Sequence, residues 1–366
     1  MRVEPSQLVP GCVLLNEVKG KSNKALIPQK TILNEEHILF LQKFLIHSVD
    51  VSSKLVDGEE FIPKEVHEEE TEQELSQENN ESNLLFKDHY HQAVSTYKVL
   101  FNKWENGFPI DMPYIRRVII PLFERMDDIS NAVYTLHHYA NKKDYFYYHG
   151  VAVGLLSAYL GKKMGFSKGE WLQIGLAGFL SDSGMAKIPP AIVTKSSSLT
   201  YQEIDEVKNH PTYSYRLVES IPTITQTVKL AVLQHHERMD GSGYPLGLTK
   251  EKIHIYARII AVCDMYHAMT TERIYKEKQS PFKVIEEIQK EQFSKLDPQV
   301  VKAFIDSLAN FSIGTKVRLS NGQLAEIVFI DARKPTRPMV RMGDKGEIIS
   351  LQDNLNLFID EIMGSQ

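Results

Sequence analysis

Apolar residues recur at helical spacing over most of the chain between residues 84 and 310. One stripe of such positions runs over residues 86–104, and others cover 113–126, 149–165 and 256–269. Side chains three or four positions apart lie on one face of a helix, so each stripe predicts a helix that packs by one face. The central region is therefore expected to be an all-α bundle of many helices.

The hydrophobic pattern changes at both ends of the chain. Residues 1–62 carry short apolar runs separated by turns, which predicts a small accessory α+β module. Residues 311–366 alternate apolar and polar positions around an Asn-Gly turn, which predicts a small β domain. Residues 63–83 are rich in Glu, Ser, Gln and Asn, and are expected to form a flexible acidic linker. The helical region is expected to comprise a lead-in over 84–143 and a main domain over 144–310.

Two capping boxes mark the starts of helices within the main domain. The Ser-x-x-Glu box at Ser167 predicts a helix that ends near Leu180. The Thr-x-x-Glu box at Thr200 predicts a helix that carries His210 up to Pro211. A candidate His therefore lies at the end of one predicted helix.

Composition limits the kinds of function that the chain can have. No stretch approaches 18 uncharged apolar residues, and no basic region precedes an apolar run at the N-terminus, so we expect a cytoplasmic protein without membrane span or signal peptide. Cys12 and Cys263 are too far apart for a CxxC motif, so any metal is expected to bind His and carboxylates. The net charge of −5, with no dominant basic block, argues against duplex nucleic acid and leaves a small anionic ligand open.

The segment His235–Pro245 holds the densest group of polar side chains and turn residues in the chain. It follows a helix whose apolar positions include Val228 and Val232. Adjacent helical residues diverge by about 100°, so His235 and His236 are better placed to bind two neighbouring ions than a single ion. The segment thus favours a site with more than one metal. A His-capped helix end followed by a turn is the structural alternative.

Four further His and Asp residues in the helical region are candidate metal ligands. Asp264 interrupts an apolar helix face, where an ionised carboxylate is costly unless it is paired or binds a metal. Asp182 follows the helix end near residue 180 and is the natural bridging carboxylate; His149 and His210 complete the set. Imidazole and carboxylate suit Mn, Fe or Zn ions, and two such ions can activate a shared water beside a phosphodiester.

The order and spacing of these residues resemble the HD-GYP domain. The resemblance spans residues 144–305, and its most diagnostic part is His235–Pro245. The matching positions are His149, Ser181-Asp182, Gly184, Lys187-Ile188-Pro189, Leu199-Thr200-x-x-Glu203, His210-Pro211, His235–Pro245, Ala257-Arg258, Asp264 and Arg273-x-Tyr275-Lys276. The resemblance implies a metal-dependent phosphodiesterase that hydrolyses cyclic di-GMP to pGpG or GMP.

The resemblance also implies a role for each matching position. Asp182 is expected to bridge two divalent transition-metal ions, of the Mn, Fe or Zn type, and to act in catalysis. Lys187 is a further catalytic candidate, as a substitute for a family Lys whose position is Met185 here. Arg273 and Lys276 are expected to hold the ligand phosphates, and Tyr244 to shape the loop beside the site. The implied metal ligands are His149, Asp182, His210, His235, His236 and Asp264.

Several positions depart from the family pattern. Ser181 replaces the His of the family's His-Asp dyad, and Met185 replaces a Lys that the family carries. Tyr145 stands where members with a third ion have Glu, which favours at most two ions. His267 replaces a family Asp one helical turn after Asp264, and is either a compensating ligand or a support for one.

These departures leave two main functional hypotheses. The first is a phosphodiesterase acting on cyclic di-GMP, slowed by the missing His and Lys. The second is a catalytically inactive regulator that binds cyclic di-GMP, or a related cyclic dinucleotide, and signals to other proteins through its terminal domains. A helical scaffold, in which the His and Asp side chains make only internal hydrogen bonds, is the third alternative.

Overall fold

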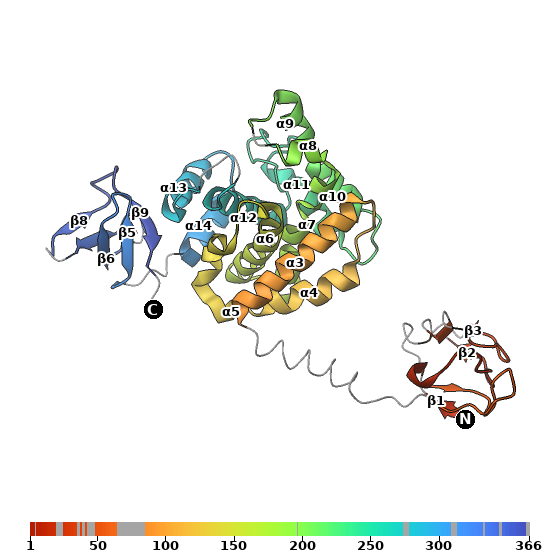
Figure 1. Cartoon of the computed structure of the whole chain (residues 1–366). Coiled ribbons are helices and arrows are strands. Elements are labelled where there is room, and N and C mark those ends of the chain that lie inside the picture. Colours follow the sequence, from red (N-terminus) through yellow and green to blue (C-terminus); the bar gives the residue numbers. More distant parts are fainter. Residues whose placement is uncertain are drawn as a thin grey trace. The chain divides into compact units, whose positions relative to one another are not determined.

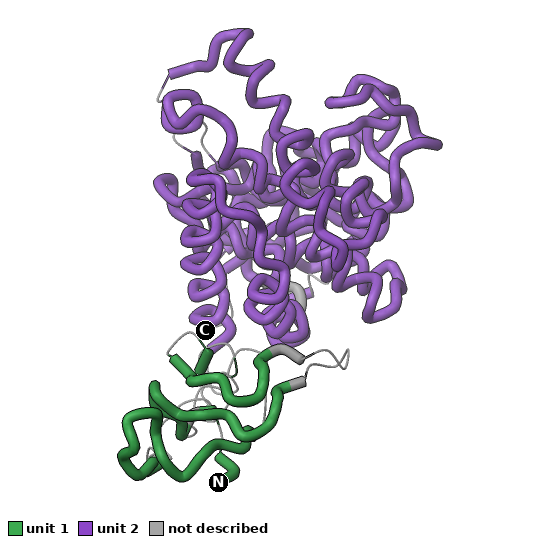
Figure 2. The backbone as a smooth tube through the Cα atoms, turned by 90° about the vertical axis from the view of Figure 1, so that its right-hand side faces the viewer, with its two compact units in different colours: residues 1–84 green, residues 85–366 purple. Residues whose placement is uncertain are grey.

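The computed structural model describes the chain except for residues 4, 20–24, 35–36, 39–40, 42–47, 64–84, 196, 274–277, 309–312, 332–333, 344–345 and 364–366. The chain forms two compact units, residues 1–84 and 85–366 (Figure 2). The linker expected over 63–83 lies, apart from Pro63, outside the described residues. The finer division of the larger unit expected from the sequence stays a prediction.

Two small antiparallel strand pairs organise the N-terminal unit. Strand β1 (Arg2–Val3) pairs with β4 (Val49–Asp50), and β2 (Val18–Lys19) pairs with β3 (Ala25–Ile27). The 3-10 helix η1 (Pro5–Gln7) follows β1. Apolar side chains form a core within this unit, including Leu8, Cys12, Leu14, Leu33, Val51 and Phe61.

The larger unit is a helical bundle followed by an antiparallel sheet, which confirms the predicted mainly α fold class (Figure 1). None of the described helices is long and apolar enough to cross a membrane. The α-helices are α3 (Phe86–Glu105), α4 (Met112–Glu124), α5 (Met126–Ile129), α6 (Tyr145–Lys163), α7 (Lys168–Leu180), α8 (Pro190–Val193), α9 (Tyr201–Val207), α10 (His210–Val218), α11 (Gln226–Gln234), α12 (Ile255–Thr270), α13 (Pro281–Glu291) and α14 (Pro298–Leu308). The 3-10 helices of this unit are η2 (Ser130–Tyr139), η3 (Ser183–Lys187) and η4 (Lys250–Lys252).

Helices α6 and α7 pack closely at the centre of the bundle. Both are buried over most of their length, as expected for helices with neighbours on several sides. A Cβ added at Gly154 of α6 would lie 3.1 Å from the carbonyl oxygen of Gly175, and one added at Gly175 would lie 3.0 Å from that of Gly154. Since glycine leaves this space free, the two backbones approach each other directly.

The prediction of one helix from Thr200 to Pro211 was wrong in extent. The capping box is present, with the hydroxyl of Thr200 accepting from the backbone N–H of Glu203, but α9 ends at Val207. His210 begins the separate helix α10, and Pro211 suits its first turn because that position needs no N–H donor. The break occurs where the His210 ring bonds the Val207 carbonyl, at 2.7 Å.

The C-terminal sheet confirms the predicted β domain. Its strands are β5 (Lys316–Leu319), β6 (Leu324–Phe329), β7 (Met339–Met342), β8 (Ile348–Ser350) and β9 (Ile359–Ile362). They pair antiparallel in the order β8-β7-β6-β5-β9. The predicted Asn-Gly turn joins β5 to β6, and Gly322 has the positive φ of 81° that such turns require.

The sheet is joined to the bundle through α13. Phe282 of α13 belongs to the apolar core of the sheet, and the hydroxyl of Ser280 donates to the carbonyl of Ile359. The guanidinium of Arg337 binds both carboxylate oxygens of Glu286 on α13. Only 13% of the Arg337 side chain and 21% of the Glu286 side chain are exposed, so this ion pair is well shielded from water.

We expect Arg337→Met to lower the free energy of unfolding by about 3 kcal/mol, because Glu286 would be left as a largely buried carboxylate without its cation. Urea denaturation followed by circular dichroism measures the change. The matched control is Arg341→Met, because the ion pair of Arg341 with Glu326 is long, at 3.8 Å, and exposed. The control should change stability by no more than about 0.5 kcal/mol. Equal losses in both variants would contradict the anchoring role of Arg337.

Candidate metal centre

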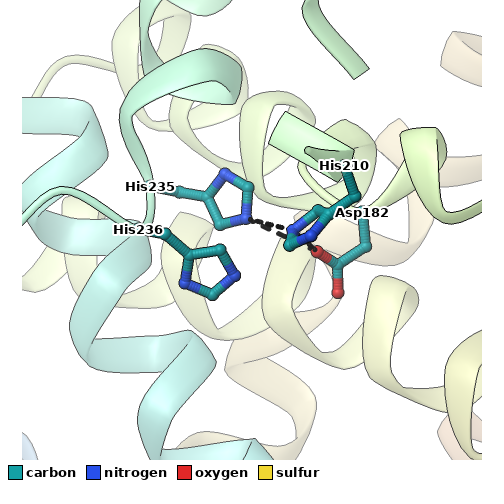
Figure 3. A group of neighbouring side chains, drawn as sticks. All are labelled: Asp182, His210, His235 and His236. Atoms are coloured by element: carbon teal, nitrogen blue, oxygen red, sulfur yellow. Dashed lines mark hydrogen bonds and ion pairs between the residues drawn. The ribbon is translucent and has the colours of Figure 1, made fainter. Parts of the chain in front are cut away.

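Six His and Asp side chains from separate segments converge inside the bundle. They come from the second turn of α6, the start of α10, the turn after α7, the end of α11 and the middle of α12, and Figure 3 shows four of them. Most of these positions are helix ends, where a side chain can turn into the space between helices. The six are His149, Asp182, His210, His235, His236 and Asp264.

The carboxylate of Asp182 lies between two groups of these ligands. Its Oδ1 is 3.2 Å from Nε2 of His210 and 3.5 Å from Nε2 of His235 (Figure 3). Its Oδ2 is 3.3 Å from Nε2 of His149. The two groups that share this carboxylate are Asp182 with His210, His235 and His236, and Asp182 with His149 and Asp264.

Asp264 closes the second group from α12. Its Oδ1 lies 2.9 Å from Nε2 of His149, and its Oδ2 lies 3.8 Å from Nδ1 of His236. His236 therefore lies beside both groups, while His235 faces Asp182. The two adjacent His side chains do not diverge as the sequence predicts: their ring centroids are 4.2 Å apart, and both belong to the group around Asp182 and His210.

The separations between the donor atoms suit bound divalent ions. Metal bonds of about 2.0–2.2 Å to His and carboxylate place neighbouring ligand atoms about 3–3.5 Å apart. In the structure His210 Nε2 and His235 Nε2 are 3.2 Å apart, and both face the same oxygen of Asp182. These residues therefore offer a cluster of ligands that could hold metal ions.

Backbone carbonyls orient two of the imidazole rings. Nδ1 of His210 lies 2.7 Å from the carbonyl of Val207, and Nδ1 of His235 lies 2.8 Å from that of Val232. Each ring can donate its Nδ1–H to that carbonyl, which leaves the lone pair of Nε2 directed at the cluster. Both rings are thus prepared to act as metal ligands.

His149 is supported on the side away from the cluster. Its Nδ1 lies 3.2 Å from the Tyr145 hydroxyl and 2.9 Å from Nδ1 of His267. Tyr145 also stacks on the His149 ring, with the centroids 5.2 Å apart. His267, which the sequence left as either ligand or support, contacts this far nitrogen of a candidate ligand.

A buried carboxylate that sequence reasoning gave no role holds the loop beside the site. Glu237 is 3% exposed and accepts hydrogen bonds from the backbone N–H groups of Leu246 and Leu248, at 2.7 and 2.8 Å. Gly243 lies against the start of the same loop, because a Cβ there would be 2.5 Å from the Glu237 Cα. The loop places the Tyr244 ring 4.7 Å from that of His236. The sequence feature that could have indicated this role is an acidic residue directly after two adjacent His residues.

Ser214 is a second supporting residue that sequence reasoning missed. Its hydroxyl accepts from the N–H of Gly184 and donates to the carbonyl of Ser181, at 2.7 and 2.6 Å. A Cβ at Gly184 would lie 2.2 Å from the His210 carbonyl, so the turn that contains Asp182 rests directly on α10. Ser214 lies four residues after His210, on the same helix face, and this spacing was the available signal.

The two replaced family positions contribute no charged or imidazole group to the cluster. The hydroxyl of Ser181 donates to the carbonyl of Gly178, 2.8 Å away on its own helix. Met185 is buried in the apolar core. Neither side chain supplies what the missing His and Lys would supply.

Two further predicted site residues, Lys187 and Arg273, are not part of the ligand cluster. The ammonium of Lys187 donates to the backbone carbonyl of Trp104 at the end of α3. The guanidinium of Arg273 donates to a carbonyl in the last turn of α12 and lies 4.7 Å above the ring of Tyr145. Lys276 lies outside the described residues. Arg273 is therefore linked to the candidate ligand His149 through Tyr145, whose hydroxyl contacts His149.

Protons and charges are strongly coupled in this cluster. Burial opposes a charge on His149, but hydrogen bonds to Asp182 and Asp264 outweigh burial and raise its pKa from 6.5 to about 9. Burial also opposes the charge of Asp182, yet the hydrogen bond from His149, together with the neighbouring rings of His210 and His235, holds the pKa of this carboxyl well below its usual range. A proton on His149 thus offsets the carboxylates when no ion is bound.

Comparison with known proteins agrees with this geometry. Residues 136–300 match the family model of the HD domain. A cyclic di-GMP phosphodiesterase of Pseudomonas aeruginosa is 34% identical over 251 residues, which cover 69% of this chain and 60% of that protein. The cyclic di-GMP phosphodiesterase PdeB of Borreliella burgdorferi is 30% identical over 229 residues, or 60% of each chain. The chain therefore spans about 60% of the length of these relatives.

A solved structure supports the fold. An HDG"Y"P protein from Bdellovibrio bacteriovorus superposes with a TM-score of 0.52, covers 84% of this chain and 99% of its own, and is 18% identical. The helical region is thus an HD domain. Within that class, the chain belongs to the HD-GYP family.

The affinity of the cluster for Mn²⁺ is expected to rise about tenfold per pH unit between pH 7 and 9 and to level off above pH 9. An imidazole must lose its proton before it binds a metal, and the raised pKa of His149 sets the upper end of this window. Calorimetric titration of the metal-free protein in buffers of different ionisation enthalpy measures both affinity and proton release. An affinity that does not change over this range would contradict the protonated state of His149.

Proposed function

We propose that this protein is a metal-dependent phosphodiesterase acting on cyclic di-GMP or a related cyclic dinucleotide. The observation that carries the proposal is the carboxylate of Asp182, which is shared by two groups of imidazole and carboxylate ligands. Two ions about 3.5–4 Å apart are the arrangement that other enzymes use to cleave phosphodiesters. The relatives named above as cyclic di-GMP phosphodiesterases support this substrate class.

Each part of the site has a task in the proposed reaction. Asp182 would contribute a carboxylate oxygen to each ion, and the imidazoles fixed by backbone carbonyls would supply neutral nitrogen ligands. When bound, two such ions supply Lewis acidity and an activated water. Glu237 holds the loop that places Tyr244 as a wall beside His236. The substrate is thereby confined on the side of the loop.

We assign phosphate binding to Arg273 and Lys276. The guanidinium of Arg273 lies over the ring of Tyr145, and the hydroxyl of Tyr145 contacts the candidate ligand His149. A guanidinium suits a phosphodiester, because it can donate two parallel hydrogen bonds to the phosphate oxygens. Lys276 follows three residues later and is assigned by its place in the motif.

One observation favours a second candidate function, a regulator that binds the nucleotide without cleaving it. The Ser181 hydroxyl is engaged with its own helix, and Met185 places an apolar side chain where the family has a cation. Loss of one preorganised donor costs about 10²–10³ in rate. Both replacements therefore weaken hydrolysis, whereas the residues assigned to nucleotide binding are unchanged.

Turnover of cyclic di-GMP with added Mn²⁺ or Fe²⁺, followed by chromatography of the products, tests the proposal. We expect slow hydrolysis that Asp182→Asn abolishes, because the amide cannot serve as a charged bridge between two ions. Asp205→Asn is the control, since Asp205 is an exposed residue of α9. Nucleotide binding without hydrolysis would support the regulator instead. Absence of both binding and hydrolysis, for cyclic di-GMP and for 3'3'-cGAMP, would contradict both functions.

Loss of affinity in Arg273→Ala tests the assignment of the phosphate-binding residue. We expect the dissociation constant for cyclic di-GMP to rise at least about tenfold, because a charge-assisted bidentate contact is lost. Arg258→Ala would disturb the fold through Asp297, so Arg216→Ala on α10 is the better control. Unchanged affinity in Arg273→Ala would exclude Arg273 as the phosphate ligand.

The double substitution Ser181→His with Met185→Lys is expected to raise kcat/KM for cyclic di-GMP by about 10²-fold, because it restores a nitrogen ligand and a cation beside the reacting phosphate. Steady-state kinetics at saturating Mn²⁺ measures the gain. The single variants, together with the metal content of each, show which residue contributes. No gain in a folded, metal-loaded variant would place the limitation outside these two positions.

A further inference from the structure

The hydroxyl of Tyr97 has no hydrogen-bond partner among the residues that the structure describes. Tyr97 lies on α3 and is 1% exposed, so bulk water does not reach it. A buried hydroxyl without a partner is costly, and native proteins rarely retain one unless it serves another purpose. The position of this hydroxyl indicates what that purpose is.

The tip of the Tyr97 ring lies against α6 beside a candidate metal ligand. A Cβ added at Gly150 would be 2.5 Å from Cζ of Tyr97 and 2.7 Å from its hydroxyl oxygen. Any side chain at residue 150 would therefore displace the phenol. Gly150 directly follows His149, so glycine at this position lets the hydroxyl approach the backbone that carries His149.

The other side of the ring packs against the end of α7. Tyr97 meets the ring of Phe179 edge to face, with the centroids 4.8 Å apart. Phe179 lies three residues before Asp182, and α3 also packs against η3, which follows Asp182. The phenol thus lies between the segment that carries His149 and the segment that carries Asp182.

Electrostatics agrees with this placement. Burial, and then the negative charge of Asp182, raise the pKa of Tyr97 well above its ordinary value. The phenol therefore keeps its hydrogen and remains a donor near this carboxylate. No direct hydrogen bond joins Tyr97 to Asp182 among the described contacts, and a bridging solvent molecule can connect two polar groups that do not touch.

We propose that Tyr97 is a positioning residue of the metal centre. Its hydroxyl donates a hydrogen bond to a solvent molecule held by Asp182 and so fixes the orientation of the shared carboxylate. This inference rests on the proposed function, in that the cluster must hold ions. It gives the site a donor from α3, a helix whose apolar stripe otherwise serves only the core.

The test is Mn²⁺ binding by Tyr97→Phe, measured by calorimetric titration together with the melting temperature of the metal-free protein. Phenylalanine keeps the ring and removes only the hydroxyl. We expect the metal-free variant to melt at the same or a higher temperature, because an unpartnered buried group is removed. We expect its dissociation constant for Mn²⁺ to rise about tenfold, as when other groups that orient metal ligands are lost.

Tyr90→Phe is the matched control. Tyr90 lies two turns earlier on α3, is fully buried, and its hydroxyl donates to the carbonyl of Tyr148 at 3.4 Å. The Tyr90→Phe variant is expected to bind Mn²⁺ with unchanged affinity.

Unchanged affinity in Tyr97→Phe would overturn the role of Tyr97 and leave the proposed function intact. A fall in melting temperature without metal, parallel to the fall in affinity, would mark Tyr97 as a packing residue and overturn the proposal as well. Wild-type protein that binds none of Mn²⁺, Fe²⁺ and Zn²⁺ would contradict the proposed function itself. Failure of the Tyr97 proposal and failure of the proposed function therefore give different results.

Discussion

The carboxylate of Asp182 is the constraint on which the site depends. Only 15% of its side chain is exposed, and a charge so placed needs partners that compensate the loss of water. His149, His210 and His235 provide these partners from three other segments. The segments therefore meet around one charged group. Without an ion, the compensation comes from hydrogen bonds and a proton on His149, and ions can replace that proton.

The rest of the bundle is arranged so that these segments can meet. Gly154 and Gly175 let α6 and α7 approach, and Gly184 lets the turn after α7 rest on the backbone of α10. Ser214 then ties this turn to α10 through one hydroxyl that both donates and accepts. Glu237 does the corresponding work for the loop after α11. Tight backbone packing and a few buried hydrogen bonds thus orient the candidate ligands before any ion binds.

Holding a metal and accelerating a reaction are separable properties of this site. Metal binding depends on imidazole nitrogens and carboxylates, and six such residues converge here although Ser181 replaces one family His. Catalysis also depends on groups that meet charge as it develops, and Ser181 and Met185 supply neither an imidazole nor a cation there. The contacts of Arg273 with Tyr145 lie on the far side of His149 and are unaffected by this loss. Under the proposed function, hydrolysis is therefore expected to be weakened more than binding of the nucleotide.

Local patterns in the sequence determined much of the fold. Helical stripes, capping boxes and the Asn-Gly turn each report on a few neighbouring residues, and the segment His235–Pro245 indicated the family and a candidate metal site. Only the tertiary structure decided where His210 begins its own helix, that Ser214 and Glu237 support the site, and that the hydroxyl of Tyr97 lies without a partner beside α6. These features depend on contacts between segments that are distant in the sequence. The spacing of apolar and polar residues along the chain does not determine such contacts.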